Sequence, residues 1–197
     1  MNEQTLDTGS IYLPLEVDRS EYLVASGIDL SDPSHTVSSK AIVSGASDFY
    51  MSTENLYICN QNWENGKSST QILKFACSEG NITAGNMAEL PGYLNDTFSL
   101  DEYQGNLRIL TTEDSNGESN SLFILDKDME IISSLRDIAS GETVRSARFV
   151  GNMGYFVTFR QTDPLFCVDL SDPEDPKILS ELKLTGFSSY LHSYGEN

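Results

Sequence analysis

Three short stretches of the sequence carry side chains that suit ligand binding. Arg145 and Arg148 lie three residues apart, and an arginine binds anionic groups through its forked guanidinium. Arg160 and Asp163 flank a polar turn, and loop residues carry function more often than core strands do. Trp63, the single tryptophan of the chain, lies among polar residues that we expect to form a loop. We therefore predict five candidate ligand-binding residues: Arg145, Arg148, Arg160, Asp163 and Trp63.

Each of these residues also has a structural explanation. An ion pair between Arg160 and Asp163, with Pro164 fixing the backbone of the turn, would stabilise a hairpin without any ligand. The other two arginines would neutralise acidic neighbours, and Trp63 would pack partly against a sheet. We favour the structural explanation for Arg160, Asp163 and Trp63, and these residues stay the candidates if a ligand binds.

Acidic residues near the C-terminus suggest a metal site. Asp169, Asp172 and Asp175 offer the hard oxygen ligands that calcium binds. Their spacing does not match the calcium loop of a helix–loop–helix unit, and a turn in which Asp and Ser cap their own backbone explains the same residues. We expect a solvated turn without a metal ion, and these three residues stay the candidate ligands if a metal binds.

No stretch of the sequence has the pattern of a catalytic site. Residues 7–10 read Asp-Thr-Gly-Ser and resemble one turn of an aspartic protease, but that chemistry needs a second carboxylate from a second such turn. The sequence has neither a nucleophile elbow nor a glycine-rich phosphate loop. We predict no catalytic residue and no cofactor.

The charge of the chain limits its partners. Twelve Lys and Arg residues against thirty Asp and Glu residues give a formal net charge of -18. Binding to nucleic acid or to an anionic membrane surface needs clustered cations, so we expect neither partner, whereas cationic partners are favoured. The chain also lacks a run of about 20 apolar residues and an apolar N-terminal leader. We therefore expect no membrane insertion and no signal peptide in this chain.

A repeat indicates how these residues are positioned. The segment 28–33, Ile-Asp-Leu-Ser-Asp-Pro, recurs at 168–173 as Val-Asp-Leu-Ser-Asp-Pro. The offset of 140 residues corresponds to three units of about 47 residues, which is typical of propeller blades. Short apolar runs with this spacing begin at residues 11, 56, 107 and 154. They are rich in β-branched and aromatic residues and are bounded by turn formers, which favours strands.

These runs predict an all-β, β-propeller-like fold of about four four-stranded antiparallel blades. After a polar tail at 1–10, a propeller domain spans 11–197, with units at about 11–46, 47–92, 97–139 and 144–185. The first unit lacks the leading strand that the others have at 48–51, 97–100 and 145–150. A surplus strand at 187–194 would complete it by pairing with 11–17, because a closed ring hides its sheet edges.

The alternative is an open arc of a larger propeller. A closed ring predicts a monomer, because the edges of its first and last blades are paired within one chain. An open arc predicts a dimer, in which a second chain covers the exposed blades. The sequence does not decide between the two.

Three longer stretches resemble a known family. They are Leu-Pro-Gly-Tyr-Leu at 90–94 leading into 98–108, the segment 144–175, and 184–192. Together they resemble bacterial and archaeal secreted proteins with a C-terminal β-propeller domain distantly related to WD repeats. The resemblance implies an extracellular or cell-envelope location and larger parent proteins without an established activity.

The prediction for function is a non-catalytic binding scaffold. Repeat architecture and the lack of a catalytic pattern favour a module that binds an unknown protein or glycan through loops at one end. The leading strands of a propeller line its central channel, which would place Arg145 and Arg148 there. The alternative is a hydrolase or lyase that acts on polysaccharide at the channel mouth, but a fold by itself does not imply an activity.

Overall fold

The chain folds into strands joined by short turns. A computed structural model describes residues 5–13, 21–46, 48–114, 117–159, 163–184 and 190–192. Within them lie fifteen strands and two short 3-10 turns, η1 (Thr8–Ser10) and η2 (Thr97–Ser99). The all-β, propeller-like class is thereby confirmed. No helix in this described part of the chain is long and apolar enough to cross a membrane.

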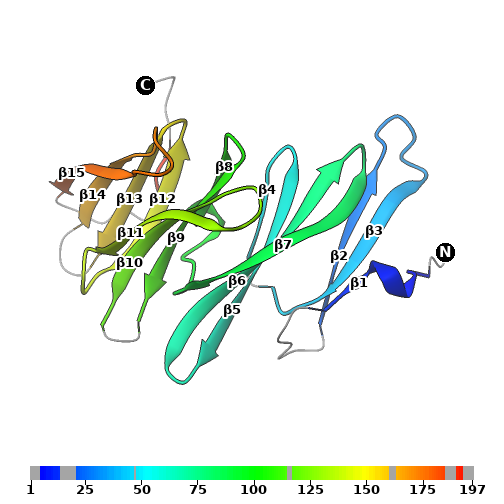
Figure 1. The fold of residues 1–197 in the computed structure, drawn as a ribbon, viewed down its shortest axis with the longest axis horizontal. Helices are drawn as coiled ribbons and strands as arrows, with labels where there is room; N and C mark the ends of the chain where they lie inside the picture. Colours follow the sequence, from blue (N-terminus) through cyan, green and yellow to red (C-terminus); the bar gives the residue numbers. More distant parts are fainter. Residues whose placement is uncertain are drawn as a thin grey trace. The chain divides into compact units, whose positions relative to one another are not determined.

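The strands form four sheets (Figure 1). The first sheet has three strands in the order β1-β3-β2: β1 (Ile11–Tyr12), β2 (Tyr22–Ile28) and β3 (Thr36–Val43). The second has the order β4-β5-β6-β7: β4 (Asp48–Met51), β5 (Asn55–Glu64), β6 (Lys67–Ser78) and β7 (Asn81–Pro91).

The third and fourth sheets follow the same up-and-down plan as the second. The third has the order β8-β9-β10-β11: β8 (Leu100–Tyr103), β9 (Asn106–Glu113), β10 (Ser119–Leu125) and β11 (Ile131–Ile138). The fourth has the order β12-β13-β14-β15: β12 (Thr143–Val150), β13 (Met153–Phe159), β14 (Asp163–Asp169) and β15 (Lys177–Leu184). In both sheets, chain neighbours pair antiparallel.

The chain divides into two compact units. The first unit contains Met1–Asn60 and Ile72–Met87, and the second contains Gln61–Gln71 and Ala88–Asn197. The chain passes between them inside β5, β6 and β7.

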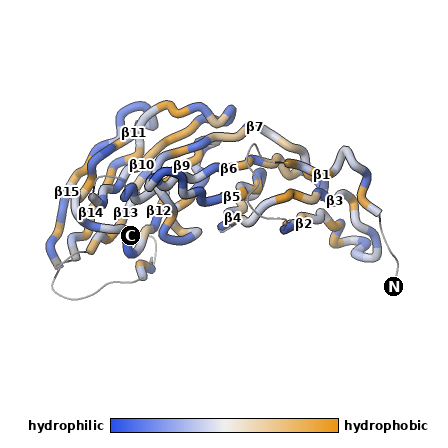
Figure 2. The backbone as a smooth tube through the Cα atoms, turned by 90° about the horizontal axis from the view of Figure 1, so that it is seen from below, coloured by the Kyte–Doolittle hydropathy of each residue, from blue (hydrophilic) through white to orange (hydrophobic). Residues whose placement is uncertain are grey.

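Each unit has its own apolar core. In the first unit, Ile42 of the first sheet packs with Ile58 and Phe75 of the second. In the second unit, Leu122 of the third sheet packs with Phe156 and Phe166 of the fourth. The two phenylalanine rings are stacked, with centroids 5.3 Å apart. The inner strands β5, β9 and β10 are buried along most of their length, and Figure 2 shows hydrophobic stretches along the backbone.

Glycine turns close several hairpins. Asn65-Gly66, Glu79-Gly80 and Gln104-Gly105 each have positive φ at both residues, the conformation of the two-residue type I′ turn that matches the twist of the flanking strands. The turn at Gly80 lies so close to β2 that a Cβ at Gly27 would stand 1.8 Å from the Gly80 carbonyl oxygen. Gly27 therefore sets how closely β2 packs in the first unit.

The first sheet departs from the plan of the other three. It has three strands, as expected of a unit without a leading strand, but β1 pairs with β3 in parallel, through Ile11 with Ala41 and Tyr12 with Ile42. We expected consecutive antiparallel strands. The parallel pairing places β1 beside the most buried part of β3. There the rings of Tyr12 and Phe75 pack edge to face, with their centroids 5.3 Å apart. Apolar burial therefore favours this arrangement.

One leading strand begins later than predicted, and the closing strand lies outside the described residues. Residues 97–99 form η2, because the Asp96 carboxylate accepts the backbone N–H of Phe98 at 2.9 Å, and β8 begins at Leu100. The predicted pairing of 187–194 with 11–17 falls mainly on segments that are not described, namely 14–20, 185–189 and 193–197. Ring closure, the open arc and the domain bounds stay predictions.

Candidate functional site

An exposed Trp63 and a half-buried Tyr93 form a stacked aromatic pair in the second unit. Their ring centroids lie 5.8 Å apart and their planes differ by 26°. Trp63 keeps 61% of its surface exposed, although it is the largest apolar side chain in the sequence. We call these two residues the aromatic platform. The exposed indole of such a stacked pair presents a flat apolar surface with a polar edge.

Trp63 lies in a strand and not in the polar loop that we expected. β5 continues to Glu64, and the Asn65-Gly66 turn then leads directly into β6. The sequence carried this signal, because Asn-Gly is the preferred pair for a type I′ hairpin turn. The hairpin therefore holds Trp63 two residues before its tip, on a strand whose pairing fixes the backbone.

The backbone around Tyr93 is fixed by the neighbouring sheets. Gly92 donates its N–H to the Ser68 carbonyl at 2.9 Å. Tyr93 and Thr112 of β9 exchange two backbone hydrogen bonds, each 2.9 Å long. The Gln61 side chain also donates to the Leu94 carbonyl at 3.4 Å. These bonds place the Tyr93 ring beside Trp63.

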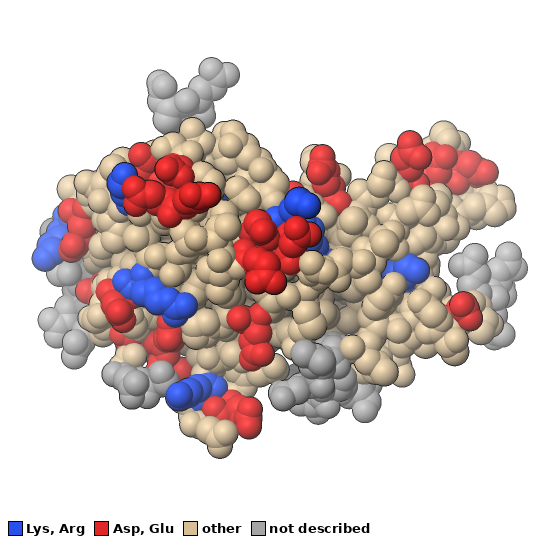
Figure 3. All heavy atoms as spheres, viewed as in Figure 1, with Lys and Arg blue, Asp and Glu red and all other residues tan. Residues whose placement is uncertain are grey.

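Charged residues surround the tyrosine. Burial raises the pKa of Tyr93, and nearby Glu118 and Asp114 raise it further, while Arg145 opposes them. The Asp114 carboxylate accepts the Ser68 hydroxyl at 2.9 Å. Acidic side chains are spread widely over the surface (Figure 3). The platform therefore has two carboxylates and one guanidinium within electrostatic range, and these groups suit a polar ligand that both donates and accepts hydrogen bonds.

Of the two predicted arginines on β12, Arg145 and Arg148, the first lies near the platform. It is exposed on β12, its backbone carbonyl accepts the Asn95 side chain at 3.4 Å, and its guanidinium lies 5.6 Å from the centre of the Phe159 ring. Arg148 has a different role. Its guanidinium lies over the rings of Phe98 and Tyr190, at 4.1 and 5.3 Å.

Arg148 also donates twice to the Leu191 carbonyl, at 3.1 and 2.9 Å. It therefore anchors the segment 190–192 to β12. The structure does not bring it together with Trp63 as one site.

The loop predicted from Arg160 and Asp163 is not described in full. Residues 160–162 lie outside the described residues, and Asp163 opens β14, where it pairs in register with Leu184 of β15. The ion pair that we considered for this loop stays a prediction.

The predicted metal ligands hydrogen-bond within their own turn. Asp169 accepts the Ser171 N–H at 2.9 Å, Asp172 accepts the Glu174 N–H at 3.0 Å, and Asp175 lies 2.7 Å from the Lys177 ammonium. In the described ranges, no group of three or more His, Cys, Asp or Glu residues is placed to hold a metal ion. The turn explanation therefore accounts for these carboxylates.

The two copies of the repeated turn predict the same behaviour towards acid. Ser31 lowers the pKa of Asp29 through its hydroxyl and its N–H, and Ser171 does the same for Asp169. A carboxyl whose pKa is lower in the folded chain stabilises the fold at neutral pH and loses that effect as the pH falls through the folded pKa. NMR titration should show both groups ionising below ordinary aspartates. Ser171→Ala should raise the pKa of Asp169 and leave that of Asp29 unchanged, and two ordinary titrations would contradict the assignment.

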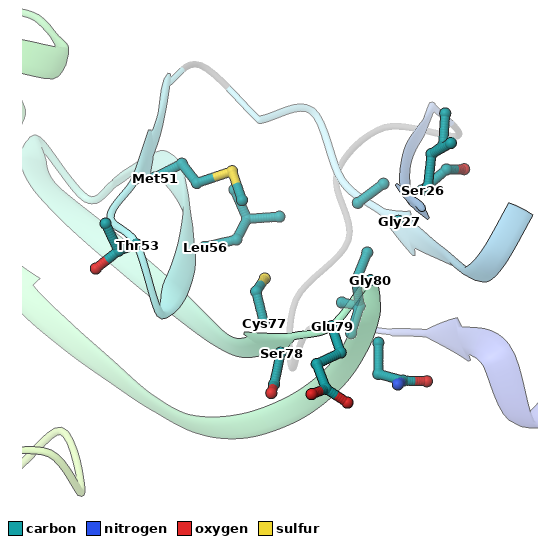
Figure 4. Close-up of a pocket in the computed structure, with 13 residues that line it drawn as sticks. Ser26, Gly27, Met51, Thr53, Leu56, Cys77, Ser78, Glu79 and Gly80 are labelled. Carbon is teal, nitrogen blue, oxygen red and sulfur yellow. The ribbon is translucent and has the colours of Figure 1, made fainter. Parts of the chain in front are cut away.

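An open cleft of about 450 Å³ lies in the first unit, between β2 and the turn that joins β6 to β7. Figure 4 shows the Cys77 sulfur on the side of Met51 and Leu56, whereas the polar ends of Ser78 and Glu79 point away from them. The polar groups of Ser78 and Glu79 therefore do not point into the space beside Met51 and Leu56. A small-molecule site needs a few polar groups that point toward the same apolar pocket. The cleft therefore adds no second candidate site.

The fold defines a class, an all-β, propeller-type protein, and the platform with its charged neighbours is its candidate functional site. A family model described as a β-propeller domain matches residues 1–197. The chain belongs to this family.

Two relatives are archaeal proteins without an assigned function. An uncharacterised protein of Archaeoglobus fulgidus is 47% identical over 128 residues, which cover 65% of this chain and 20% of that protein. An uncharacterised protein of Methanocaldococcus jannaschii is 36% identical over 141 residues, which cover 70% of this chain and 22% of that protein. The chain thus spans about a fifth of the length of these relatives.

Sequence reasoning missed most residues around Trp63. Tyr93 entered as part of a family-like stretch, and Asp114 and Glu118 had no distinguishing pattern among thirty acidic residues. The tyrosine follows a Pro-Gly pair, which indicates a turn, but a turn signal does not say which strand the next residue will meet.

Proposed function

We propose that this chain is a non-catalytic binding module that recognises a carbohydrate through the aromatic platform. The observation that carries the proposal is the exposed indole of Trp63 stacked on Tyr93. The apolar face of a sugar ring packs on such a surface, and the carboxylates of Asp114 and Glu118 would accept its hydroxyl groups. Arg145 would donate to ring or carboxyl oxygens. An extracellular or envelope location, which the family resemblance implies, stays a prediction.

The single tryptophan makes the test specific. Because Trp63 is the sole indole of the chain, its fluorescence reports on the platform directly. Titration with soluble oligosaccharides, beginning with cellohexaose and including acidic oligogalacturonates, should shift or quench the emission. Trp63→Ala should raise the dissociation constant at least about tenfold, as measured by calorimetry. An aromatic side chain that the bound ligand covers contributes more than about 1.4 kcal/mol to the binding free energy.

A matched control is Phe49→Ala, which removes an equally exposed aromatic residue, 61% exposed, from the first unit. This variant should bind as the wild type does. The proposal fails if no sugar changes the emission at millimolar concentration, or if Trp63→Ala binds with full affinity. A reducing-end assay on the same mixtures tests the alternative of a polysaccharide hydrolase, since a binding module leaves the oligosaccharides intact.

A further inference from the structure

The edge strands of the four sheets differ in one respect. The outer strands β4, β7, β8, β11, β12 and β15 all carry charged residues, for example Asp48, Glu89, Asp101, Arg136, Arg145 and Lys177. Charges and prolines on an edge strand prevent pairing with another chain. Among the described edge strands longer than two residues, β2 has neither a charge nor a proline in its sequence Tyr-Leu-Val-Ala-Ser-Gly-Ile. β2 therefore lacks the usual protection.

One face of β2 is also apolar and exposed. Leu23 and Ala25 pack against the core of the first unit. Their neighbours on the opposite face, Tyr22 and Val24, are 65% and 56% exposed. Val24 and Ile11 of β1 both pair with Ala41 in register, so the three form one row across the sheet. When another strand pairs with β2, this exposed apolar row would add cross-strand contacts between its side chains and those of the added strand.

Charge decides which surface suits a second copy of the chain. Each copy carries a formal net charge of -18, so two copies repel each other over most of their surfaces. β2 itself carries no charge, so repulsion at this edge comes only from the flanking Glu21 and Asp29. Strand pairing would satisfy the outward backbone groups of both edges. A two-fold axis requires each copy to present the same strand, which an antiparallel β2 pair does.

We propose that β2 joins two copies of this chain into a dimer, with β2 of each copy pairing antiparallel into one six-stranded sheet. The acidic flanks select the register. A pair centred on Val24 places Tyr22 opposite Ser26 and Glu21 opposite Gly27 of the second copy. A pair centred on Ala25 would place Glu21 opposite Asp29, and facing like charges are unfavourable. The register centred on Val24 is therefore the one that forms.

The dimer is tested by light scattering after size exclusion over a range of concentrations. The mass should approach twice the 21.8 kDa of the chain, and salt should strengthen the association because it screens the acidic surfaces. Val24→Lys should raise the dissociation constant at least about tenfold, because it places two like charges at the centre of the pair. Phe49→Lys, the same change at an equally exposed residue of the first unit, should leave the dimer intact.

Oxidative crosslinking tests the register. Val24→Cys should give a disulfide-linked dimer, because directly opposite residues have Cβ atoms about 4.5–5.5 Å apart, and Tyr22→Cys should not. A wild type that stays monomeric at all concentrations would overturn the proposal and leave β2 to a sheet of a longer chain. Equal crosslinking of both cysteine variants would overturn the register. Circular dichroism confirms that each variant is folded.

Discussion

Replacing Arg108 by alanine is expected to lower the free energy of unfolding by about 3–5 kcal/mol, the cost of breaking a buried ion pair. Arg108 is the third residue of β9, and its side chain is 3% exposed. Its Nε and Nη2 atoms donate to the Asp101 carboxylate, and Nη1 donates to the Gly151 carbonyl at 2.7 Å. One side chain thus ties the third sheet to the turn between β12 and β13.

Two aromatic rings add to the cost of losing this arginine. The guanidinium lies 4.8 Å from the centre of the Tyr103 ring and 5.1 Å from that of Phe149, and each such contact contributes about 0.5–2 kcal/mol. The Asp101 side chain is 24% exposed, so in the variant water can solvate the carboxylate that Arg108 no longer pairs with. We therefore expect a loss of about 3 kcal/mol, the lower end of the range for a buried ion pair. Urea unfolding followed by Trp63 fluorescence measures the change, since both residues belong to the second unit.

Arg136→Ala is the matched control. Its guanidinium also lies over a ring, 4.6 Å from the centre of Phe123, and pairs with Glu113 at 3.8 Å, but its side chain is 46% exposed. An exposed pair contributes at most about 1 kcal/mol, so this variant should lose far less. Equal losses in the two variants would show that burial of Arg108 has no special importance. A double-mutant cycle with Asp101→Asn would then isolate the energy of the pair.

The strands could be predicted because their signals are local. Apolar runs at Ile58, Ile109 and Phe156 are rich in β-branched and aromatic residues and are followed by turn formers, and each lies in the second strand of its sheet. A predicted strand boundary was wrong where a side chain took a backbone N–H that the sheet would otherwise pair. Asp96 captures the Phe98 N–H and delays β8, an effect that apolar periodicity does not register.

The candidate site depends on contacts between distant segments. Trp63, Tyr93, Glu118 and Arg145 come from four separate parts of the chain, and their approach follows from how the sheets of the second unit pack. The same holds for Arg108. The sequence Leu-Arg-Ile at 107–109 predicts a strand, but it does not predict that the arginine side chain binds Asp101 and Gly151. Local patterns give the elements, whereas side-chain contacts require the packing between them.

Gly92→Ala is expected to lower the free energy of unfolding by about 2–5 kcal/mol, combining backbone strain with overpacking. Gly92 has φ of +90°, a conformation that side chains other than glycine rarely adopt. A Cβ at this position would lie 2.7 Å from the Thr112 carbonyl oxygen. That oxygen accepts the Tyr93 N–H, so the clash falls on the bond that positions the tyrosine.

Gly105→Ala separates the two contributions. Gly105 has a similar φ of +81°, but no atom lies within 4 Å of the Cβ that alanine would add. This control should lose about 1–2 kcal/mol, the cost of the left-handed conformation, and the excess in Gly92→Ala measures the clash with β9. Because that clash displaces Tyr93 and not Trp63, oligosaccharide binding should weaken in Gly92→Ala under conditions where the variant is still folded, and stay unchanged in Gly105→Ala. Equal stability losses would mean that β9 yields to the added carbon, and the platform would then keep its geometry.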